Sequence, residues 1–139
     1  MLEFSLYQYL NSQTEITNIV GTMIFPLVIP QAKKNFTPTY PAITFNLIDD
    51  VPIYDLSGYV GMTRARVQID YWSDVSNKAV VNLADVVRLK LQSYRGDMSG
   101  TNVSNCRLID SHTTYQPPID GSDNWIYRKQ SDYMFSYFL

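Results

Sequence analysis

The chain has 139 residues, of which 45% are hydrophobic and 17% charged, which is enough to bury the core of one domain, expected over residues 1–139. Its 11 basic and 13 acidic residues give a net charge of −2, which excludes the basic surface that sequence-specific nucleic-acid binding requires. A single cysteine, Cys106, and a single histidine, His112, exclude an intramolecular disulfide and a closed structural zinc site.

The N-terminal residues follow a helical pattern. Apolar side chains recur at three- and four-residue spacing, which predicts a helix over residues 2–12 and a further helical turn near 14–20. Gly21 is a natural helix stop, because glycine adopts the left-handed conformation at helix ends. Residues 23–29 are apolar but interrupted by proline, which cannot donate ladder hydrogen bonds, so we expect an edge strand or an extended segment.

Two strands are predicted in the middle of the chain. The first covers residues 42–48 and is expected to end at Asp49 and Asp50, before a long connection over residues 52–61, with a short strand at 53–56 as an alternative within it. The second covers residues 62–72 and is expected to nucleate the core, because it alternates with period two. Its apolar face consists of Ala65, Val67, Ile69 and Tyr71. Its polar face consists of Arg64, Arg66, Gln68, Asp70 and Trp72.

A long helix is predicted after this strand. The apolar spacing becomes helical from about residue 75 to residue 93, with Asp74 as a plausible N-cap and Gly96 as a plausible C-cap. The predicted apolar stripe consists of Val75, Ala79, Leu83, Val86 and Val87. We expect this stripe to cover the sheet.

The C-terminal third predicts two further strands. One covers residues 103–111 and changes the parity of its apolar residues, as a β-bulge would require. After an exposed loop over 113–124, the last strand covers 125–138 and is apolar on both faces. The order of elements predicts an α+β fold with a single antiparallel or mixed sheet. The long helix and the N-terminal helix are expected mainly on one face of that sheet.

Few residues suit catalysis. Asp110, Ser111 and His112 contain the residue types of a catalytic triad, but neighbours on a strand point to opposite faces. The main interpretation is a surface histidine, and a small hydrolase using His112 with Ser111 or Asp110 is the alternative. Cys106 is expected to be a buried, unreactive thiol. No metal or nucleotide site is predicted, because the acidic and glycine-containing segments lack the required spacing.

Contacts with other protein chains are the more natural use of this sequence. The chain contains 11 tyrosines, and tyrosine is enriched at protein–protein interfaces. The face with Arg64 and Arg66 is either solvated, with an internal ion pair, or a subunit contact, and both interpretations stay open. The doubly apolar last strand predicts coverage by the helices on one side and by another molecule, such as a second copy, on the other.

No segment predicts membrane insertion or secretion. The N-terminus has no positive charges followed by an apolar stretch, and no segment approaches the roughly 18 apolar residues of a membrane span. We therefore expect a soluble protein of a reducing cytoplasm, without a membrane partner.

Several segments, taken in order, resemble the tail completion proteins of tailed phages, which are also called tail terminators or head-tail joining proteins. They are residues 54–58 (YDLSG), 63–70 (TRARVQID), the long helix with 94–96 (YRG), 115–121 (YQPPIDG) and 127–128 (YR). The opening residues and Phe25-Pro26 also fit, so the resemblance covers nearly the whole chain.

The resemblance implies a non-enzymatic virion protein without a cofactor, assembled in the cytoplasm of the bacterial host. Copies, usually six, would close a ring on the head-proximal end of the tail tube. The ring would contact the major tail tube protein and a head-completion or neck protein, and genomic DNA would pass through its lumen without sequence-specific binding. An adaptor or stopper nearer the portal is the alternative within the same virion.

The ring implies two sets of candidate residues. Contacts between copies are expected from Arg64, Arg66, Gln68, Tyr133 and Tyr137. The wall of the lumen is expected to be acidic, from Asp49, Asp50 and Asp55, because carboxylates repel DNA. Loops over residues 31–40, 49–61 and 112–124 would contact the tube and the neck.

Overall fold

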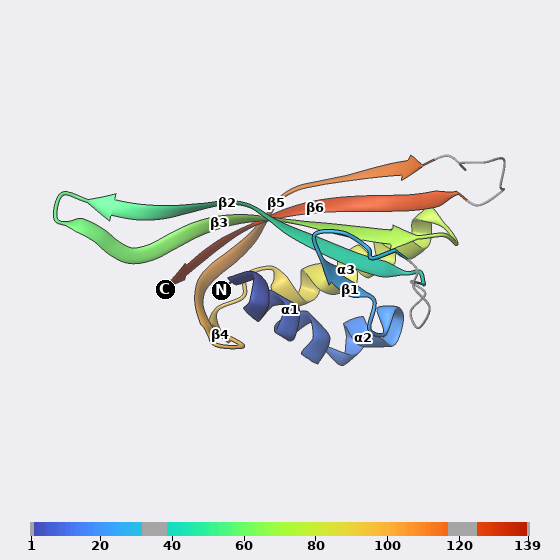
Figure 1. The fold of residues 1–139 in the computed structure, drawn as a ribbon, viewed down its shortest axis with the longest axis horizontal. Coiled ribbons are helices and arrows are strands. Elements are labelled where there is room, and N and C mark those ends of the chain that lie inside the picture. Colours follow the sequence, from blue (N-terminus) through green and yellow to red (C-terminus); the bar gives the residue numbers. More distant parts are fainter. Residues whose placement is uncertain (1, 32–38, 117–124, 139) are drawn as a thin grey trace.

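A computed structural model describes residues 2–31, 39–116 and 125–138. Six of the described segments are strands of one mixed sheet, and the described helices lie against one face of it (Figure 1). In chain order the elements are α1 (Leu2–Ser12), α2 (Thr14–Val20), β1 (Ile24–Pro26), β2 (Ala42–Asp55), β3 (Gly58–Ser73), α3 (Asn77–Leu91), β4 (Gly96–Met98), β5 (Thr101–Gln116) and β6 (Ile126–Phe138). The predicted α+β class is confirmed.

The strand order in the sheet is β1-β2-β3-β6-β5-β4. Only β1 and β2 are parallel, and the other neighbouring strands are antiparallel. β3 therefore lies in the interior of the sheet, and the alternation predicted over residues 62–72 is observed. Its residues Ala65, Ile69 and Tyr71 are completely buried, whereas Arg64 on the other face is exposed.

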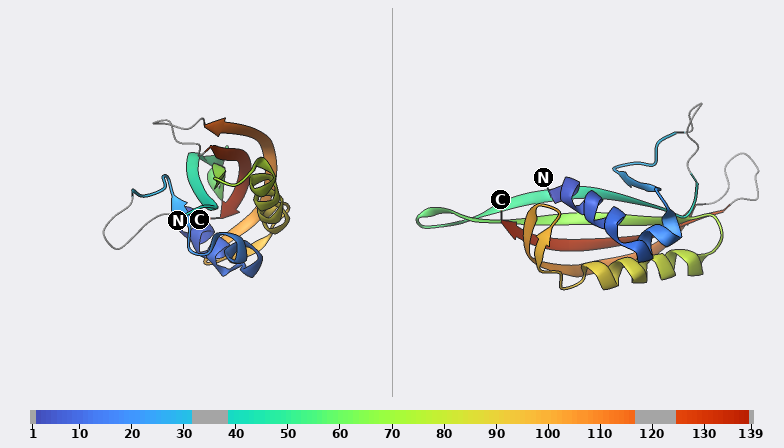
Figure 2. Two further views of the ribbon diagram at one scale, coloured as in Figure 1. Left: turned by 90° about the vertical axis from the view of Figure 1, so that its right-hand side faces the viewer. Right: turned by 90° about the horizontal axis from the view of Figure 1, so that it is seen from below.

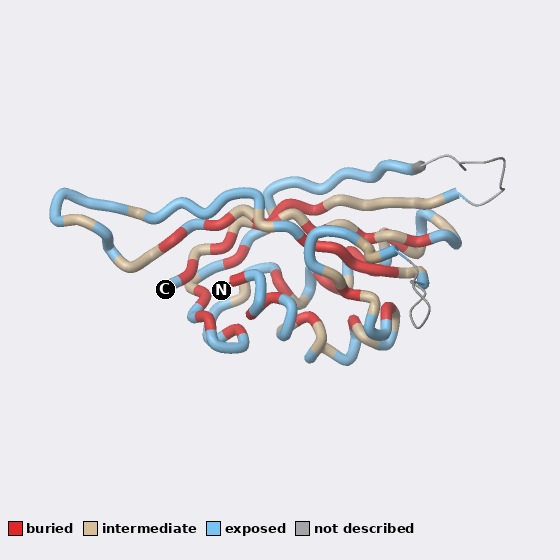
Figure 3. The backbone as a smooth tube through the Cα atoms, viewed as in Figure 1, coloured by how far each residue is buried: buried red, intermediate tan, exposed pale blue. Residues whose placement is uncertain are grey.

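The core lies between the sheet and the layer formed by α1 and α3, which lie across the same face (Figures 2 and 3). Both helices place an apolar residue toward the sheet at every third or fourth position. These buried residues are Leu2, Leu6 and Leu10 of α1 and Val80, Leu83, Ala84, Val87 and Leu91 of α3. The predicted stripe of α3 was wrong at Val75, which is 74% exposed because it precedes the helix.

The start of α3 also differs from the prediction. Ser76, rather than Asp74, is the N-cap, and its hydroxyl oxygen accepts a hydrogen bond from the Ala79 N–H at 3.2 Å. Gln92 is the C-cap, and Gly96 begins β4 instead of ending the helix. A serine oxygen bonded to the third helical N–H satisfies one of the donors that an α-helix leaves unpaired.

Removing this cap should weaken the helix measurably. Ser76→Ala is expected to lower the free energy of unfolding by about 1 kcal/mol, because the Ala79 N–H loses its acceptor. Ser76→Asp is the matched control, since aspartate caps as well as serine does. Urea denaturation of the three proteins measures the difference, and equal midpoints for wild type and Ser76→Ala would contradict the assignment.

The region predicted as a long connection is instead a β-hairpin. β2 does not end at Asp49 and Asp50 but runs to Asp55, and only a two-residue turn separates it from β3. The hairpin projects beyond the helices (Figure 1). Pro52 has no backbone N–H to donate to a neighbouring strand. It is tolerated in β2 because β1 pairs only with residues 43–45 of that strand, so no described strand lies beside Pro52 on the outer edge of the sheet. At the turn, the Asp55 carboxylate accepts hydrogen bonds from the Ser57 N–H and hydroxyl at 2.7 and 2.6 Å.

The C-terminal strands are longer than predicted. β5 contains the expected bulge between Val103 and Asn105, a second register shift near Ile109, and continues through residues 113–116 of the predicted loop. The remainder of that loop and residues 32–38 of the first one lie outside the described residues. The short β4, which pairs with the start of β5, was not predicted.

Within residues 2–31, 39–116 and 125–138, no helix combines the length and apolar composition that a membrane crossing needs.

Candidate functional site

Polar and charged residues line the face of the sheet opposite the helices, here called the open face. Directly paired residues of neighbouring strands point to the same side, so the strand register defines this face. None of the described helices lies on it (Figure 1). Its charged and titratable residues are Asp49, Arg64, Arg66, Asp70, Arg107, Asp110, His112, Arg128 and Asp132. Among these, the arginines are matched by an equal number of aspartates, so the described open face has no basic excess.

Two ion pairs connect β3 and β6 on the open face. Arg66 Nη2 donates to Asp132 Oδ2 at 2.6 Å, and Arg128 Nη2 donates to Asp70 Oδ2 at 2.9 Å. Both pairs run diagonally between the strands, because Arg66 lies directly opposite Met134. The hydrogen bond to Asp132 is the main reason that the pKa of Arg66 is raised. The pairs therefore neutralise charges on the face itself.

Large side chains cover the open face near the end of β3 and the start of β6. The Arg128 guanidinium lies 4.9 Å from the centroid of the Trp72 ring, and Trp72 Nε1 donates to Thr44 Oγ1 at 3.0 Å. Thr44 and Asp132 are only 3% and 6% exposed, although none of the described helices covers them. Part of the open face is therefore covered by its own polar and aromatic side chains, whereas Asp49, Arg64 and Arg107 are exposed.

Each ion pair uses a single N–H. The Nε atoms of Arg66 and Arg128 and the Oδ1 atoms of Asp70 and Asp132 are buried and have no hydrogen-bond partner among the described residues. A bidentate arginine–carboxylate pair would satisfy two N–H groups and both oxygens. The two pairs thus retain unused hydrogen-bonding capacity.

Three of the predicted contact residues lie together on the open face. Arg64 is exposed, and Arg66 and Gln68 are half-buried on the same strand. Of the two interpretations left open for this face, the pairing of Arg66 with Asp132 supports the internal ion pair.

The other two predicted contact residues, Tyr133 and Tyr137, lie on the opposite face. They are 0% and 3% exposed, so the protomer itself covers both rings and the predicted position at the surface is corrected. Burial raises the pKa of Tyr133 to about 12, and Tyr137 donates its hydroxyl proton to Asp50 Oδ1 at 3.0 Å. The alternation of β6 indicates two faces but not which of them the helices cover.

The three candidate lumen carboxylates do not converge. Asp49 pairs with Arg66 across β2 and β3 and therefore lies on the open face, whereas Asp50 pairs with Ala65 and points to the helix side. Asp55 lies in the hairpin turn, where Ser57 lowers its pKa by hydrogen bonding. Only Asp49 remains a candidate for a wall formed by the open face.

The geometry does not assemble a catalytic triad. His112 and Asp110 share the open face, with 3.8 Å between Nδ1 and Oδ2. Ser111 points to the other side, where its hydroxyl lies 3.4 Å from that of Ser131. The histidine cannot activate this serine, as the alternation of the strand predicts. The described residues also contain no group of three or more His, Cys, Asp or Glu that could hold a metal ion.

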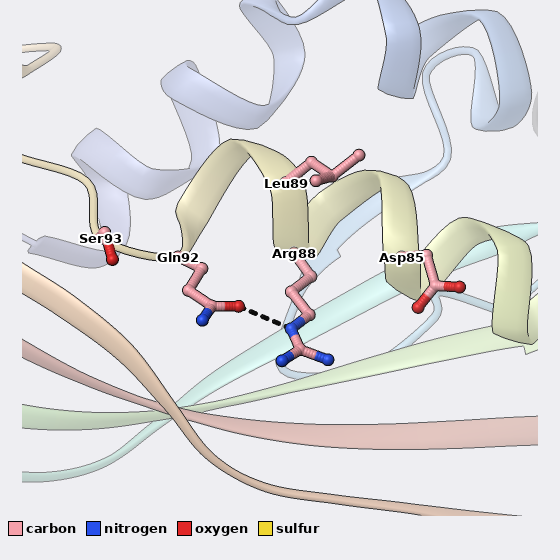
Figure 4. A pocket seen from close by; sticks show the side chains of 5 residues that line it. All are labelled: Asp85, Arg88, Leu89, Gln92 and Ser93. Atoms are coloured by element: carbon pink, nitrogen blue, oxygen red, sulfur yellow. Dashed lines mark hydrogen bonds between the residues drawn. The ribbon is translucent and has the colours of Figure 1, made fainter.

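A hollow of about 560 Å³ lies along the C-terminal half of α3 (Figure 4). It is lined by Asp85, Arg88, Leu89, Gln92 and Ser93. Arg88 Nε donates to Gln92 Oε1 at 2.6 Å, and Leu89 points away from both. The Arg88 guanidinium is therefore already hydrogen-bonded to a residue at the end of its own helix, and the residues that line the hollow include no hydrogen-bonded pair of nucleophile and base.

Exposed apolar surface occurs in two other places. At the hairpin tip, Leu56 is fully exposed and the rings of Tyr54 and Tyr59 pack at 5.8 Å between centroids. Beside α1, a hollow of about 290 Å³ includes Phe4, which is 64% exposed, and Phe45. Exposed apolar residues at scattered positions are normal on protein surfaces, so these two places do not by themselves identify a binding partner.

Comparison with known proteins gives a family and a number of structures with a similar fold. The family model described as "Tail completion protein gp17" matches residues 5–120. The fold is similar to a chain in the structure "Virion of native gene transfer agent (GTA) particle", with a TM-score of 0.75 and 14% sequence identity. That likeness covers 99% of this chain and 95% of the other. The search of curated proteins found no match.

Proposed function

The chain belongs to the tail completion protein gp17 family, and from this membership we propose that its copies form a ring that closes the head-proximal end of a phage tail tube. Membership makes the protein a structural component of the tail or neck of a virion. The proposed ring joins the tube to the neck and leaves a lumen for DNA. The family match over residues 5–120, which includes both major helices and most of the sheet, is the observation that supports this proposal.

The proposed ring consists of six copies and contacts a major tail tube protein on one side and a head-completion or neck protein on the other. A closed ring requires two different, complementary surfaces on each copy. The protomer is asymmetric in this sense, because the β2–β3 hairpin projects from one end (Figure 1). The apolar hollow lies elsewhere, beside α1. Catalysis forms no part of the proposal.

The open face is the proposed wall of the lumen. DNA must slide past this wall, and unpaired arginines would hold its phosphates. Here Arg66 and Arg128 are paired with aspartates, and Asp49 adds a further carboxylate. Pairing thus neutralises Arg66 and Arg128, and Asp49 and Asp110 match the two remaining arginines of this face, Arg64 and Arg107, in number.

Adding positive charge to the open face should make the ring bind DNA. Gln68→Lys is expected to retain duplex DNA in a salt-dependent manner, because the change adds one cation per copy to the proposed wall. Asn82→Lys adds the same charge on the exposed side of α3 and should bind much less. Fluorescence anisotropy with labelled DNA at low and physiological salt measures both, and equal binding by the two variants would contradict the lumen assignment.

The role itself is tested by electron microscopy of the purified protein mixed with tail tubes. We expect ring-shaped density at one end of each tube. We also expect the tubes to stop growing once the protein is bound. Density found next to the portal of an intact particle, with bare tube ends, would instead identify a neck adaptor or stopper. Protein that binds neither site would reject both roles.

A further inference from the structure

We propose that the tip of the β2–β3 hairpin of one copy docks in the hollow along α3 of the neighbouring copy, where Leu56 and the Asp55 carboxylate lie beside Arg88. The inference rests on the ring in the proposed function and names the contact that joins its copies. It depends on three observations: an apolar tip that projects from the protomer, a hollow of matching size and charge, and the unequal distribution of charge between the two sides of the protomer.

The tip of the hairpin is an apolar projection that its own protomer leaves uncovered. β6 pairs with β3 only from Met62 onward, so the end of the hairpin has only two strands, and none of the described helices lies against it (Figure 1). Leu56 and Tyr54 are exposed there, and Asp55 is the only charged residue within 51–61. Depletion of charge together with tyrosine is typical of the centre of an interface. An isolated two-stranded hairpin is also marginally stable in water, so a partner surface would stabilise this tip.

The tip cannot reach the hollow of its own copy. Ser93, which lines the hollow, donates its N–H to the Cys106 carbonyl oxygen at 2.7 Å. Cys106 lies in one row with Phe135 and Ala65, and Ala65 lies seven positions after Gly58 at the turn. At about 3.3 Å per residue, roughly 23 Å along the strands separates this row from the turn. Contact between the tip and the hollow can therefore arise only between copies.

The hollow along α3 has the size and the charge that the tip requires. Its volume of about 560 Å³ lies within the range of small-ligand sites, about 300–1,000 Å³, so it has room for the side chains of a turn. Arg88 is exposed and forms no ion pair with a described residue, because only its Nε is used, by Gln92. The terminal nitrogens of Arg88 point away from the helix (Figure 4). A small cavity that shares Arg88 with the hollow adds Lys129, so two cations and one carboxylate, Asp85, line the combined space. Its net charge is opposite to that of the tip.

The distribution of charge over the protomer favours a contact between two different surfaces. The elements α1, α2, β1 and β2 contain five Asp or Glu residues and no Lys or Arg. From the start of α3 to the end of β4, residues 77–98 contain four Lys or Arg residues and two Asp residues. Two acidic sides would repel each other, whereas the acidic β2 side of one copy and the basic α3 side of the next attract. Such a head-to-tail contact can close into a ring.

Cysteine cross-linking tests the contact. The variant with Leu56→Cys and Gln92→Cys is expected to give, on mild oxidation, a covalent ladder on a non-reducing gel that ends at the number of copies in the ring. Leu27→Cys with Gln92→Cys is the matched control and should give no ladder, because Leu27 is an exposed leucine that follows β1 instead of lying in the hairpin. The single variants should also give none, and the buried Cys106 is present in every variant. Rings visible in micrographs without a ladder from the Leu56 pair would overturn the docking and leave the proposed function intact.

A charge exchange gives a second readout that leaves Asp55 and its turn unchanged. Leu56→Lys is expected to weaken ring assembly, measured by size-exclusion chromatography, by at least about tenfold, because it places a cation beside Arg88 of the next copy. Leu27→Lys is the control and should assemble like the wild type. Adding Arg88→Glu to Leu56→Lys should recover assembly, since opposite charges then meet.

Two results would contradict the docking in different ways. If the double variant assembles no better than Leu56→Lys, while it melts like the wild type, the docking is overturned and the ring remains. If the wild type forms no ring with or without tail tubes, the proposed function fails, and this contact fails with it.

Discussion

Ile69→Ala is expected to lower the free energy of unfolding by about 2–5 kcal/mol. Ile69 is completely buried on β3, where Phe45 of β2 lies on one side and Ser131 of β6 on the other. The helices close the space above it. Because hydrogen-bonded strands on both sides hold β3 in place, the structure cannot collapse into the cavity that alanine leaves. Urea denaturation monitored by circular dichroism measures the loss.

A matched truncation separates burial from residue type. Leu89→Ala removes a side chain of similar size, but Leu89 is 84% exposed on α3, so its effect should stay within about 0.5 kcal/mol. A loss below about 1 kcal/mol for Ile69→Ala would contradict the placement of β3 at the centre of the core.

Alkaline pH is expected to lower the free energy of unfolding, because buried thiol and phenol groups lose their protons more easily in the unfolded chain than in the folded one. Burial raises the pKa of Cys106 from 9.0 to about 12, and burial raises the pKa of Tyr133 from 10.0 to about 12. Burial also raises the pKa of Tyr71. In the unfolded chain these groups release their protons at lower pH. Stability is therefore complete below about pH 9 and falls as the pH rises toward 12, by about 1.4 kcal/mol per pH unit for each such group.

Tyr133→Phe tests this pH dependence, because it keeps the ring and removes the ionisable hydroxyl. Its free energy of unfolding, measured by urea titration from pH 8 to pH 11, should decline less steeply above pH 10 than that of the wild type. Tyr115→Phe is the control, since Tyr115 is 65% exposed and folding does not bury it. Identical profiles for wild type and Tyr133→Phe would show that Tyr133 is not buried in solution.

The elements defined by one-sided burial could be predicted from the sequence. The alternation of Ala65, Val67 and Ile69 with polar residues is a direct consequence of one covered and one uncovered face, so β3 and its orientation were predicted correctly. The spacing of Leu2, Leu6 and Leu10 likewise identified α1. These patterns are local, and the packing that causes them acts on each element separately.

Features that depend on neighbouring strands could not be predicted in this way. The sequence at Asp49, Asp50 and Pro52 suggests the end of a strand. β2 nevertheless continues, because no described strand pairs with its outer edge at these residues, so the proline removes no hydrogen bond from the sheet. Tyr133 and Tyr137 were assigned to the surface because alternation does not indicate which side of β6 faces the helices.

The most direct test of the account is the mass of the purified protein, measured by light scattering during size-exclusion chromatography, with and without tail tube protein. A ring-forming protein gives a discrete closed assembly, of about 96 kDa for six copies of the 16.0 kDa chain, with a central hole in micrographs. A protein that stays at 16.0 kDa under both conditions and at all concentrations would contradict it.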